Sequence, residues 1–284
     1  MIKVSDLIFT YPGNTEPTLR GLEFTIDHGE IFGFLGPSGA GKSTTQNILI
    51  GLLHEYQGEV RVLDEALRSI TPEYYERVGV AFEFPNFYTK FSALENLEYY
   101  RSLYRGETED PENLLDMVGL AEDAETRVGS FSKGMRMRLN FCRALLNKPE
   151  LLFLDEPTAG LDPANARRIR EIITAKQQEG VTVFLTTHNM TAADALCDRV
   201  AFIVDGEIVL IDTPRELKVR GSSKILRIEY RENGQLNQVD FPMEGLPENR
   251  EFLEILQHKD IETLHSQEAT LEDIFIRTTG KQLR

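Results

Sequence analysis

A glycine-rich segment that ends in lysine and serine has the composition of a phosphate-binding loop. Residues 36–43 read Gly-Pro-Ser-Gly-Ala-Gly-Lys-Ser and fit the pattern G-x-x-x-x-G-K-[ST], between an apolar run and a helical one. Glycines let the backbone curl so that several N–H groups point at one anion, which the N-terminus of the following helix also attracts. Lys42 is expected to reach the β- and γ-phosphates of a nucleotide, and the Ser43 hydroxyl to ligate Mg²⁺. The residues expected to bind ATP here are Gly36, Pro37, Ser38, Gly39, Ala40, Gly41, Lys42, Ser43 and Thr44.

Two adjacent carboxylates, Asp155 and Glu156, follow the apolar run 151–154. A carboxylate at the end of a buried strand is what such a nucleotide site needs to hold Mg²⁺. Neighbouring side chains at a strand end point in different directions, so Asp155 can serve the metal and Glu156 the attacking water. The alternative is a solvated acidic turn, which the complete phosphate loop makes the weaker interpretation.

The elements that must position these residues are indicated by the apolar pattern. It predicts strands at about 1–11, 22–26, 30–35, 151–154, 181–186 and 200–204, and helices at 41–53 and 163–178. Alternating strands and helices imply an α/β fold with a parallel sheet, here a phosphate-loop (P-loop) NTPase core that begins with antiparallel strands. Helical segments, among them 92–104 and 113–118, replace strands over about 86–150, which we expect to form a helical subdomain inserted in the core.

The last sixty residues change character again. Leu226, Ile228 and Tyr230 alternate with polar residues like a half-buried strand, and Phe252, Ile255 and Leu256 resemble one helix face. We therefore expect an ATPase domain over 1–217 and a small α+β accessory domain over 222–284.

The amino-acid composition argues against several classes of protein function. The 284 residues include 31 Lys and Arg against 46 Asp and Glu, a formal net charge of −15, which argues against a dedicated nucleic-acid binder. Apolar stretches are far shorter than the roughly 18 residues of a membrane span, and no signal peptide is visible. Two cysteines give no disulfide framework and suit a reducing cytoplasm.

A third motif gives the chain a family resemblance. Residues 131–135, Phe-Ser-Lys-Gly-Met, resemble the signature of ABC transporter ATP-binding subunits, and the resemblance covers about 1–217. Lys133 and Met135 replace the usual glycine and glutamine, as in drug- and polysaccharide-exporting ATPases. The resemblance implies that Ser132, Lys133 and Gly134 bind the ATP of a second copy. From the residues alone, Ser132 is equally a good helix N-cap.

Three further residues take roles from the same resemblance. Asp162 ends a segment, 159–162, that resembles the D-loop coupling the two nucleotide sites of a dimer. His188 resembles the switch histidine that contacts the γ-phosphate, and Tyr11 the aromatic residue stacked on adenine. The alternatives are a polar surface histidine and a packed strand tyrosine.

One residue departs from the family pattern. Where the family usually has glutamine near Mg²⁺ and the attacking water, this chain has Glu83 in the stretch Phe-Glu-Phe-Pro at 82–85. We expect Glu83 to join Asp155 at the metal, the nearby carboxylates to raise one another's pKa, and metal dependence to become steeper. A glutamate here resembles the lantibiotic-immunity branch, and residues 268–275 resemble the tail of drug-resistance exporters.

The resemblance predicts an ATP-hydrolysing subunit of a transporter, favouring export, with ATP and Mg²⁺ as cofactors. Its expected partners are membrane-spanning permease subunits and a second ATPase copy, with no nucleic acid. It is expected in the cytoplasm on the inner face of the membrane. Residues 86–130 are expected to dock the permease, with Phe84, Phe87, Tyr88 and Phe91 as candidates or simply core residues. The alternative is a non-transport ATPase with a soluble macromolecular partner, which would normally have a long coiled coil or a second phosphate loop.

Overall fold

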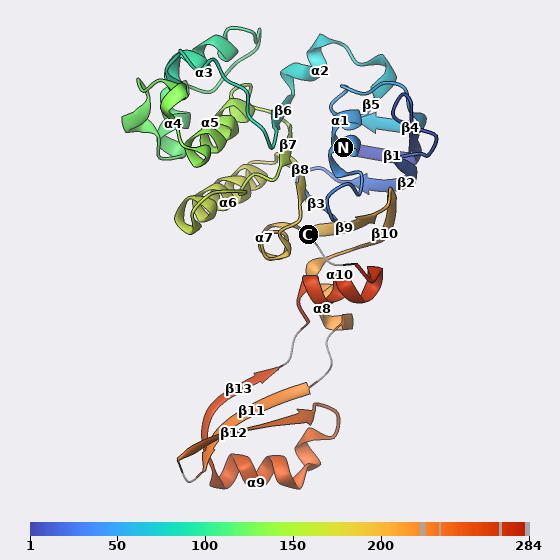
Figure 1. Ribbon diagram of the computed structural model, residues 1–284, viewed down its shortest axis with the longest axis vertical. Coiled ribbons are helices and arrows are strands. Elements are labelled where there is room, and N and C mark those ends of the chain that lie inside the picture. Colours follow the sequence, from blue (N-terminus) through green and yellow to red (C-terminus); the bar gives the residue numbers. More distant parts are fainter. Residues whose placement is uncertain (222–224, 233, 267–268, 282–284) are drawn as a thin grey trace. The chain divides into compact units, whose positions relative to one another are not determined.

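The computed structural model describes residues 1–221, 225–232, 234–266 and 269–281. It divides into two compact units, Met1–Asp212 and Thr213–Lys281. Figure 1 shows the elements of both units along the chain.

The first unit is built on a six-stranded sheet in the order β10-β9-β3-β8-β7-β6. Strands β6, β7, β8, β3 and β9 are parallel, and β10 is antiparallel to β9. Every residue of β3, β7 and β8 is buried, as expected of central parallel strands with both faces covered. The predicted α/β fold with a mainly parallel sheet is confirmed. Its strands are β3 (Ile31–Leu35), β6 (Val78–Ala81), β7 (Leu151–Asp155), β8 (Thr182–Thr187), β9 (Arg199–Val204) and β10 (Glu207–Asp212).

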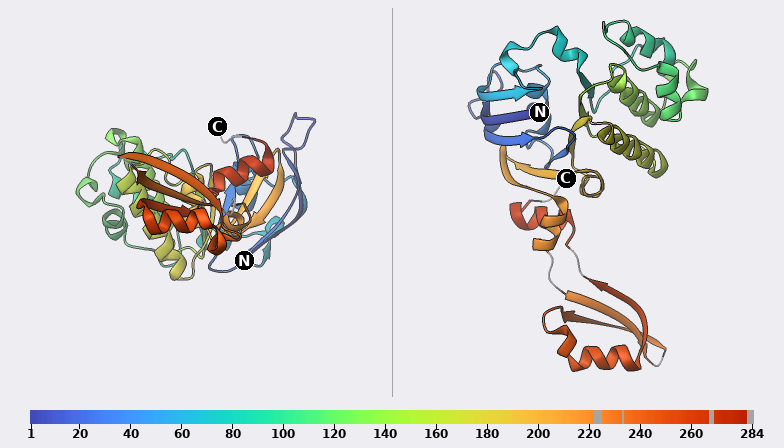
Figure 2. Two further views of the ribbon diagram at one scale, coloured as in Figure 1. Left: turned by 90° about the horizontal axis from the view of Figure 1, so that it is seen from below. Right: turned by 180° about the vertical axis from the view of Figure 1, so that it is seen from behind.

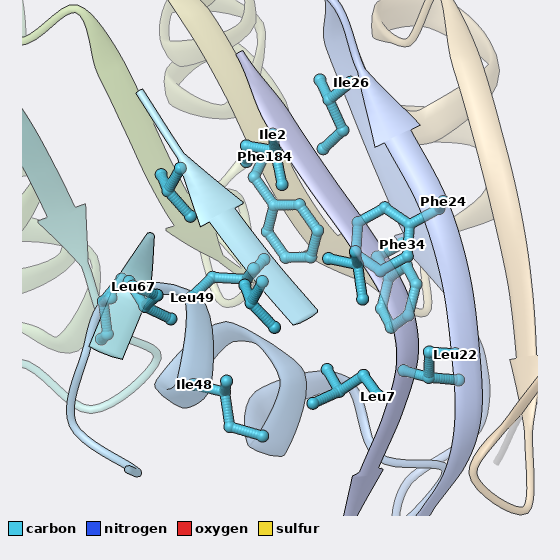
Figure 3. Packing of buried hydrophobic residues seen from close by; sticks show 14 of the residues in the cluster. Ile2, Leu7, Leu22, Phe24, Ile26, Phe34, Ile48, Leu49, Leu67 and Phe184 are labelled. Atoms are coloured by element: carbon cyan, nitrogen blue, oxygen red, sulfur yellow. The ribbon is translucent and has the colours of Figure 1, made fainter. Parts of the chain in front are cut away.

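A second, antiparallel sheet in the order β2-β1-β4-β5 faces the first across the main core. Alternating buried residues of β1 and β2, such as Leu7 and Phe24, meet Phe34 of β3 and Phe184 of β8 (Figure 3). The ring centres of Phe34 and Phe184 are 5.5 Å apart. Its strands are β1 (Ile2–Phe9), β2 (Leu19–Ile26), β4 (Gln57–Val62) and β5 (Glu65–Ala66).

Helix α1 (Lys42–Leu49) follows the phosphate loop and contributes Ile48 and Leu49 to this core. It ends four residues before the predicted 53, because the chain turns at Gly51, whose φ is +76° and whose N–H donates to the carbonyl of Ile48. Helix α6 (Pro163–Gln178) has the predicted bounds, and α7 (Met190–Leu196) follows β8.

The helical subdomain comprises α3 (Ala93–Arg101), α4 (Pro111–Met117) and α5 (Lys133–Leu145), preceded by the short α2 (Pro72–Glu76). A capping box between Ser92 and Glu95 begins α3, and the Asp110 carboxylate caps α4. Figure 1 shows α3, α4 and α5 grouped beside β6 and β7, and Figure 2 shows the same group, in green, from two further sides.

Within its described residues, the second unit contains a three-stranded antiparallel sheet, β12-β11-β13, three α-helices and a short 3-10 helix, Leu246–Glu248. Phe252 and Ile255 of α9 pack on Leu226 and Ile228 of the sheet, but Leu256 is 41% exposed, so its predicted place on the buried face is wrong. Helices α8 and α10 pack on each other. Glu268, the first residue of the predicted exporter-like tail, lies outside the described residues. The elements are α8 (Pro214–Gly221), β11 (Ile225–Glu232), β12 (Gln235–Pro242), α9 (Arg250–His258), β13 (Asp260–Ser266) and α10 (Leu271–Thr279).

Candidate functional site

The phosphate loop joins β3 to α1 and adopts a backbone that needs its glycines. Gly39 and Gly41 have φ of +80° and +108°, the left-handed region that favours glycine, and Gly41 is the N-cap of α1. Gly36 is needed for another reason, since a Cβ at this position would lie 2.2 Å from the carbonyl oxygen of Ile203. The backbone of the loop therefore depends on glycine at three positions of the sequence pattern.

Lys42 is the cation of the loop. Its Nζ donates to the carbonyl oxygens of Gly36 at 2.7 Å and Pro37 at 3.0 Å. Burial lowers the pKa of Lys42, while the negative charges of Glu156 and Asp155 oppose that change. The loop carbonyls thus hold the ammonium group close to the place where phosphates would lie.

Asp155, the last residue of β7, faces the loop. Its carboxylate accepts a hydrogen bond from the Ser43 hydroxyl at 3.4 Å and another from the Thr186 hydroxyl of β8. Burial, and to a smaller extent the charge of Glu156, raises the pKa of Asp155. The parallel register, in which Asp155 pairs with Thr186, brings these groups together.

Glu156 comes immediately after the strand, with φ of +49°, and its carboxylate is held on both oxygens. Oε2 accepts from the Thr187 hydroxyl at 2.9 Å, and Oε1 accepts from the backbone N–H of His188 at 2.8 Å. The Nδ1 atom of His188 lies 2.6 Å from the same Oε1. Glu156 and His188, for which the sequence predicts separate roles, are therefore in direct contact.

These side chains surround a cleft of about 450 Å³. Tyr11 lies at one side, where its hydroxyl is 3.1 Å from Oγ1 of Thr44. The lining residues are Tyr11, Thr18, Ser38, Gly39, Gly41, Lys42, Ser43, Thr44, Glu83, Asp155, Glu156 and His188. Residues from six separate parts of the sequence thus meet at one end of the central sheet.

Sequence reasoning missed three polar residues of this region. Thr18 lines the cleft, and Thr186 and Thr187 hydrogen-bond the two acidic residues. Thr186 and Thr187 could have been found from the sequence, because they are two hydroxyl residues directly before His188 at the end of a predicted strand. Nothing in its sequence context marked Thr18.

Ser132, Lys133, Gly134 and Asp162 do not line this cleft. Ser132 is the N-cap of α5, accepting from the Met135 N–H at 3.2 Å, and Asp162 caps α6. Gly160 lies beside the stem of Lys133, whose Cε would be 3.3 Å from a Cβ at Gly160. The signature and D-loop segments thus form a second cluster within the same chain.

The donor atoms of the cleft fit a hard cation held together with a nucleotide. Ser43 and Asp155 supply adjacent hydroxyl and carboxylate oxygens, the ligand types that Mg²⁺ takes alongside phosphate and water. No cluster of three or more His, Cys, Asp or Glu within the described ranges is arranged to hold a metal by protein ligands alone.

Of the four aromatic residues expected at a docking surface, one is a core residue. Phe87 is buried beneath the guanidinium of Arg143, 5.1 Å from its ring centre. Phe84 is 77% exposed, and Tyr88 and Phe91 are also exposed and lie against each other. Among the described helices, none combines the length and hydrophobicity of a membrane span.

Comparisons with known proteins agree with this geometry. Residues 19–159 match the family described as ABC transporter. A fluoroquinolones export ATP-binding protein of Mycobacterium tuberculosis is 55% identical over 284 residues, covering all of this chain and 94% of that protein. A linearmycin resistance ATP-binding protein of Bacillus subtilis is 31% identical, with 94% of each chain covered. This chain belongs to the ABC transporter family.

The remaining comparisons concern the ABC fold and the second unit. A dimeric ATP-binding cassette solved in a post-hydrolysis state with ADP and Pi aligns with a TM-score of 0.69 and 28% identity, over 75% of this chain and 98% of that one. Residues 224–268 match a family described as the fluoroquinolone efflux ABC transporter C-terminal domain. The predicted resemblance to export-type ABC ATPases is confirmed, and the non-transport alternative is not supported.

Proposed function

We propose that this ABC ATPase hydrolyses Mg²⁺–ATP in the cleft and thereby powers an exporter. The observation that carries the proposal is the convergence of Lys42, Ser43, Asp155 and Glu156 on one cleft, with the Ser43 hydroxyl 3.4 Å from the Asp155 carboxylate. When bound, Mg²⁺ offsets the charge of the phosphates. Ser43 and Asp155 would hold it, with Glu83 as a further ligand.

The chain's own residues divide the remaining work. Residues 36–44 bind the phosphates through backbone N–H groups and Lys42, whose charge offsets the negative charge of the transferred phosphoryl group. Glu156 orients the attacking water and accepts its proton, and His188, in contact with Glu156, faces the γ-phosphate. Tyr11 stacks on the adenine.

A second copy completes each site. Ser132, Lys133 and Gly134 lie outside the cleft of their own chain, which supports a role at the nucleotide of a partner. Lys133 and Gly134 lie against residues of the segment 159–162, which ends at Asp162. We propose that this contact couples the two nucleotide sites of the dimer. The dimeric state of the related cassette supports this arrangement.

The membrane partner and cargo are inferred from the relatives. We place the chain in the cytoplasm against permease subunits on the inner face of the membrane, with exposed Phe84, Tyr88 and Phe91 at the docking surface. Fluoroquinolones are the proposed cargo class, because a relative named for their export is 55% identical over the whole chain. The segment 222–284 is proposed as an accessory domain in addition to the ATPase domain 1–217. The match of residues 224–268 to the fluoroquinolone efflux C-terminal domain family supports this.

The chemistry is tested with two variants of the purified chain. Glu156→Gln is expected to bind ATP normally and to hydrolyse it about 10²- to 10⁴-fold more slowly, because it loses the water-orienting carboxylate. Lys42→Ala is expected to lose ATP binding. Near-normal hydrolysis by Glu156→Gln contradicts the assignment of Glu156.

The cargo is tested in cells that express this chain together with candidate permease subunits. Lower fluoroquinolone accumulation is expected with the wild-type chain and not with Lys42→Ala. Equal accumulation in both strains contradicts the cargo class but leaves the ATPase assignment intact.

A further inference from the structure

Thr187, the last residue of β8, is 2% exposed and lies against Glu156. Its Oγ1 donates to Oε2 of Glu156 at 2.9 Å and accepts from the backbone N–H of Asn189 at 3.0 Å. A hydroxyl has only one proton, and the Asn189 N–H occupies an acceptor lone pair. The Thr187 proton is therefore directed at the carboxylate.

The position of this hydroxyl is fixed by the fold. Threonine is β-branched, so χ1 is restricted, and β8 is paired on both sides, with β3 and with β7. One residue earlier, Thr186 donates to Asp155. Because consecutive side chains of a strand point to opposite faces, one strand end supplies each of the two acidic residues with its own hydroxyl.

We propose that Thr187 is a positioning residue for ATP hydrolysis, one that fixes the rotation of the Glu156 carboxylate. The inference rests on the proposed function of Glu156. The Thr187 hydroxyl holds Oε2 and the backbone N–H of His188 holds Oε1. The plane of the carboxylate is therefore fixed relative to the attacking water. Hydrogen bonds to a charged acceptor are stronger than neutral ones, which makes this contact an effective constraint.

The test measures single-turnover hydrolysis and ATP affinity for two pairs of variants that differ by the hydroxyl. Thr187→Val is compared with wild type, and Thr187→Ala with Thr187→Ser. Thr182→Val is the matched control, because Thr182 has a buried hydroxyl on the same strand that accepts from the Gly29 N–H at 2.9 Å, at the other end of β8.

Loss of the Thr187 hydroxyl is expected to lower the hydrolysis rate about 10- to 100-fold, as a small misplacement of a reacting group does, with ATP affinity unchanged. Thr187→Ser is expected to stay within about threefold of wild type, and Thr182→Val to keep the wild-type rate. If Thr187→Val does not fold, the Ala and Ser pair carries the comparison.

A double variant separates positioning from general stability. In a Glu156→Gln background, Thr187→Val is expected to cause no further loss, because the carboxylate it orients is gone. An additive loss, a loss of ATP affinity, or failure of serine to restore the rate overturns the inference. So does a wild-type rate in Thr187→Val while Glu156→Gln is slow, whereas a wild-type rate in Glu156→Gln itself refutes the proposed catalytic role of Glu156.

Discussion

The side-chain amide of Asn140 donates to the carbonyl oxygen of Phe82 at 2.7 Å, directly before Glu83. Asn140 lies within α5 and is fully buried, and its Oδ1 accepts from Nη2 of Arg143 at 2.6 Å. Arg143 in turn donates from Nη1 to the carbonyl of Asn86 at 3.1 Å. Helix α5 therefore holds the loop 82–86 through contacts on both sides of Glu83.

Asn140→Ala is expected to lower the free energy of unfolding by about 1–3 kcal/mol, because it leaves the Phe82 carbonyl and the Arg143 guanidinium with fewer partners in a buried place. Urea unfolding measures the change. Asn113→Ala, at an exposed asparagine of α4, is the control and is expected to change stability by less than about 0.5 kcal/mol. Equal stability of the two variants contradicts a structural role for the Asn140 network.

The contrast between Lys42 and Asn140 shows what could be predicted from the sequence. The phosphate loop is a local pattern, since its glycines, Lys42 and Ser43 are contiguous and lie between a strand and a helix in the predicted order. The role of Asn140 depends on a contact with residue 82, far away along the chain, and an asparagine within a helical pattern carries no sign of its partner. The same holds for Thr186 and Thr187, whose contacts follow from the pairing of β7 with β8.

The predicted buried face of α9 and the predicted end of α1 were wrong where the local sequence pattern was ambiguous. Three apolar residues of α9 were equally compatible with one buried face, but the sheet covers only Phe252 and Ile255. A single glycine, Gly51, ended α1 through a left-handed turn that an apolar run did not reveal. Tertiary packing decided the first case, and a local backbone turn decided the second.

The two cysteines are expected to be unreactive in the folded protein. Burial raises the pKa of both the Cys142 and Cys197 thiols, so the reactive thiolate is scarce, and the buried positions exclude the reagent. A colorimetric disulfide reagent at pH 8 should detect almost no thiol in the native chain and both thiols after unfolding in urea. Fast reaction of one thiol in the native chain would show that its surroundings open readily.

Dimerisation is expected to depend on ATP. The Glu156→Gln variant with ATP and without Mg²⁺ should elute as a dimer in size-exclusion chromatography. Ser132 and Gly134 of each copy then bind the ATP of the other, and no hydrolysis occurs to separate the two copies. Adding Lys42→Ala to this variant should restore the monomer, since nucleotide binding is lost. A monomer in every condition, with no crosslink between copies in the complex reconstituted with the membrane subunits, contradicts the shared site.

Glu83→Gln tests the residue at which this chain departs from its family. Glu83 lines the same cleft as Asp155 and Glu156, and its negative charge favours the charged form of Lys42, so it contributes to the field at the phosphates. Carboxylates about 4–6 Å apart repel each other and the nucleotide, and bound Mg²⁺ removes much of that penalty.

Glu83→Gln is therefore expected to bind ATP more tightly than wild type without Mg²⁺, and its ATP affinity should rise less steeply with Mg²⁺ concentration. A fluorescent ATP analogue titrated at several Mg²⁺ concentrations measures both effects. Glu95→Gln, which changes a carboxylate at the capping box of α3, is the matched control for loss of one negative charge, and should follow the wild-type curve. Superimposable curves for Glu83→Gln and wild type would mean that Glu83 points away from the metal and serves the loop held by Asn140 instead.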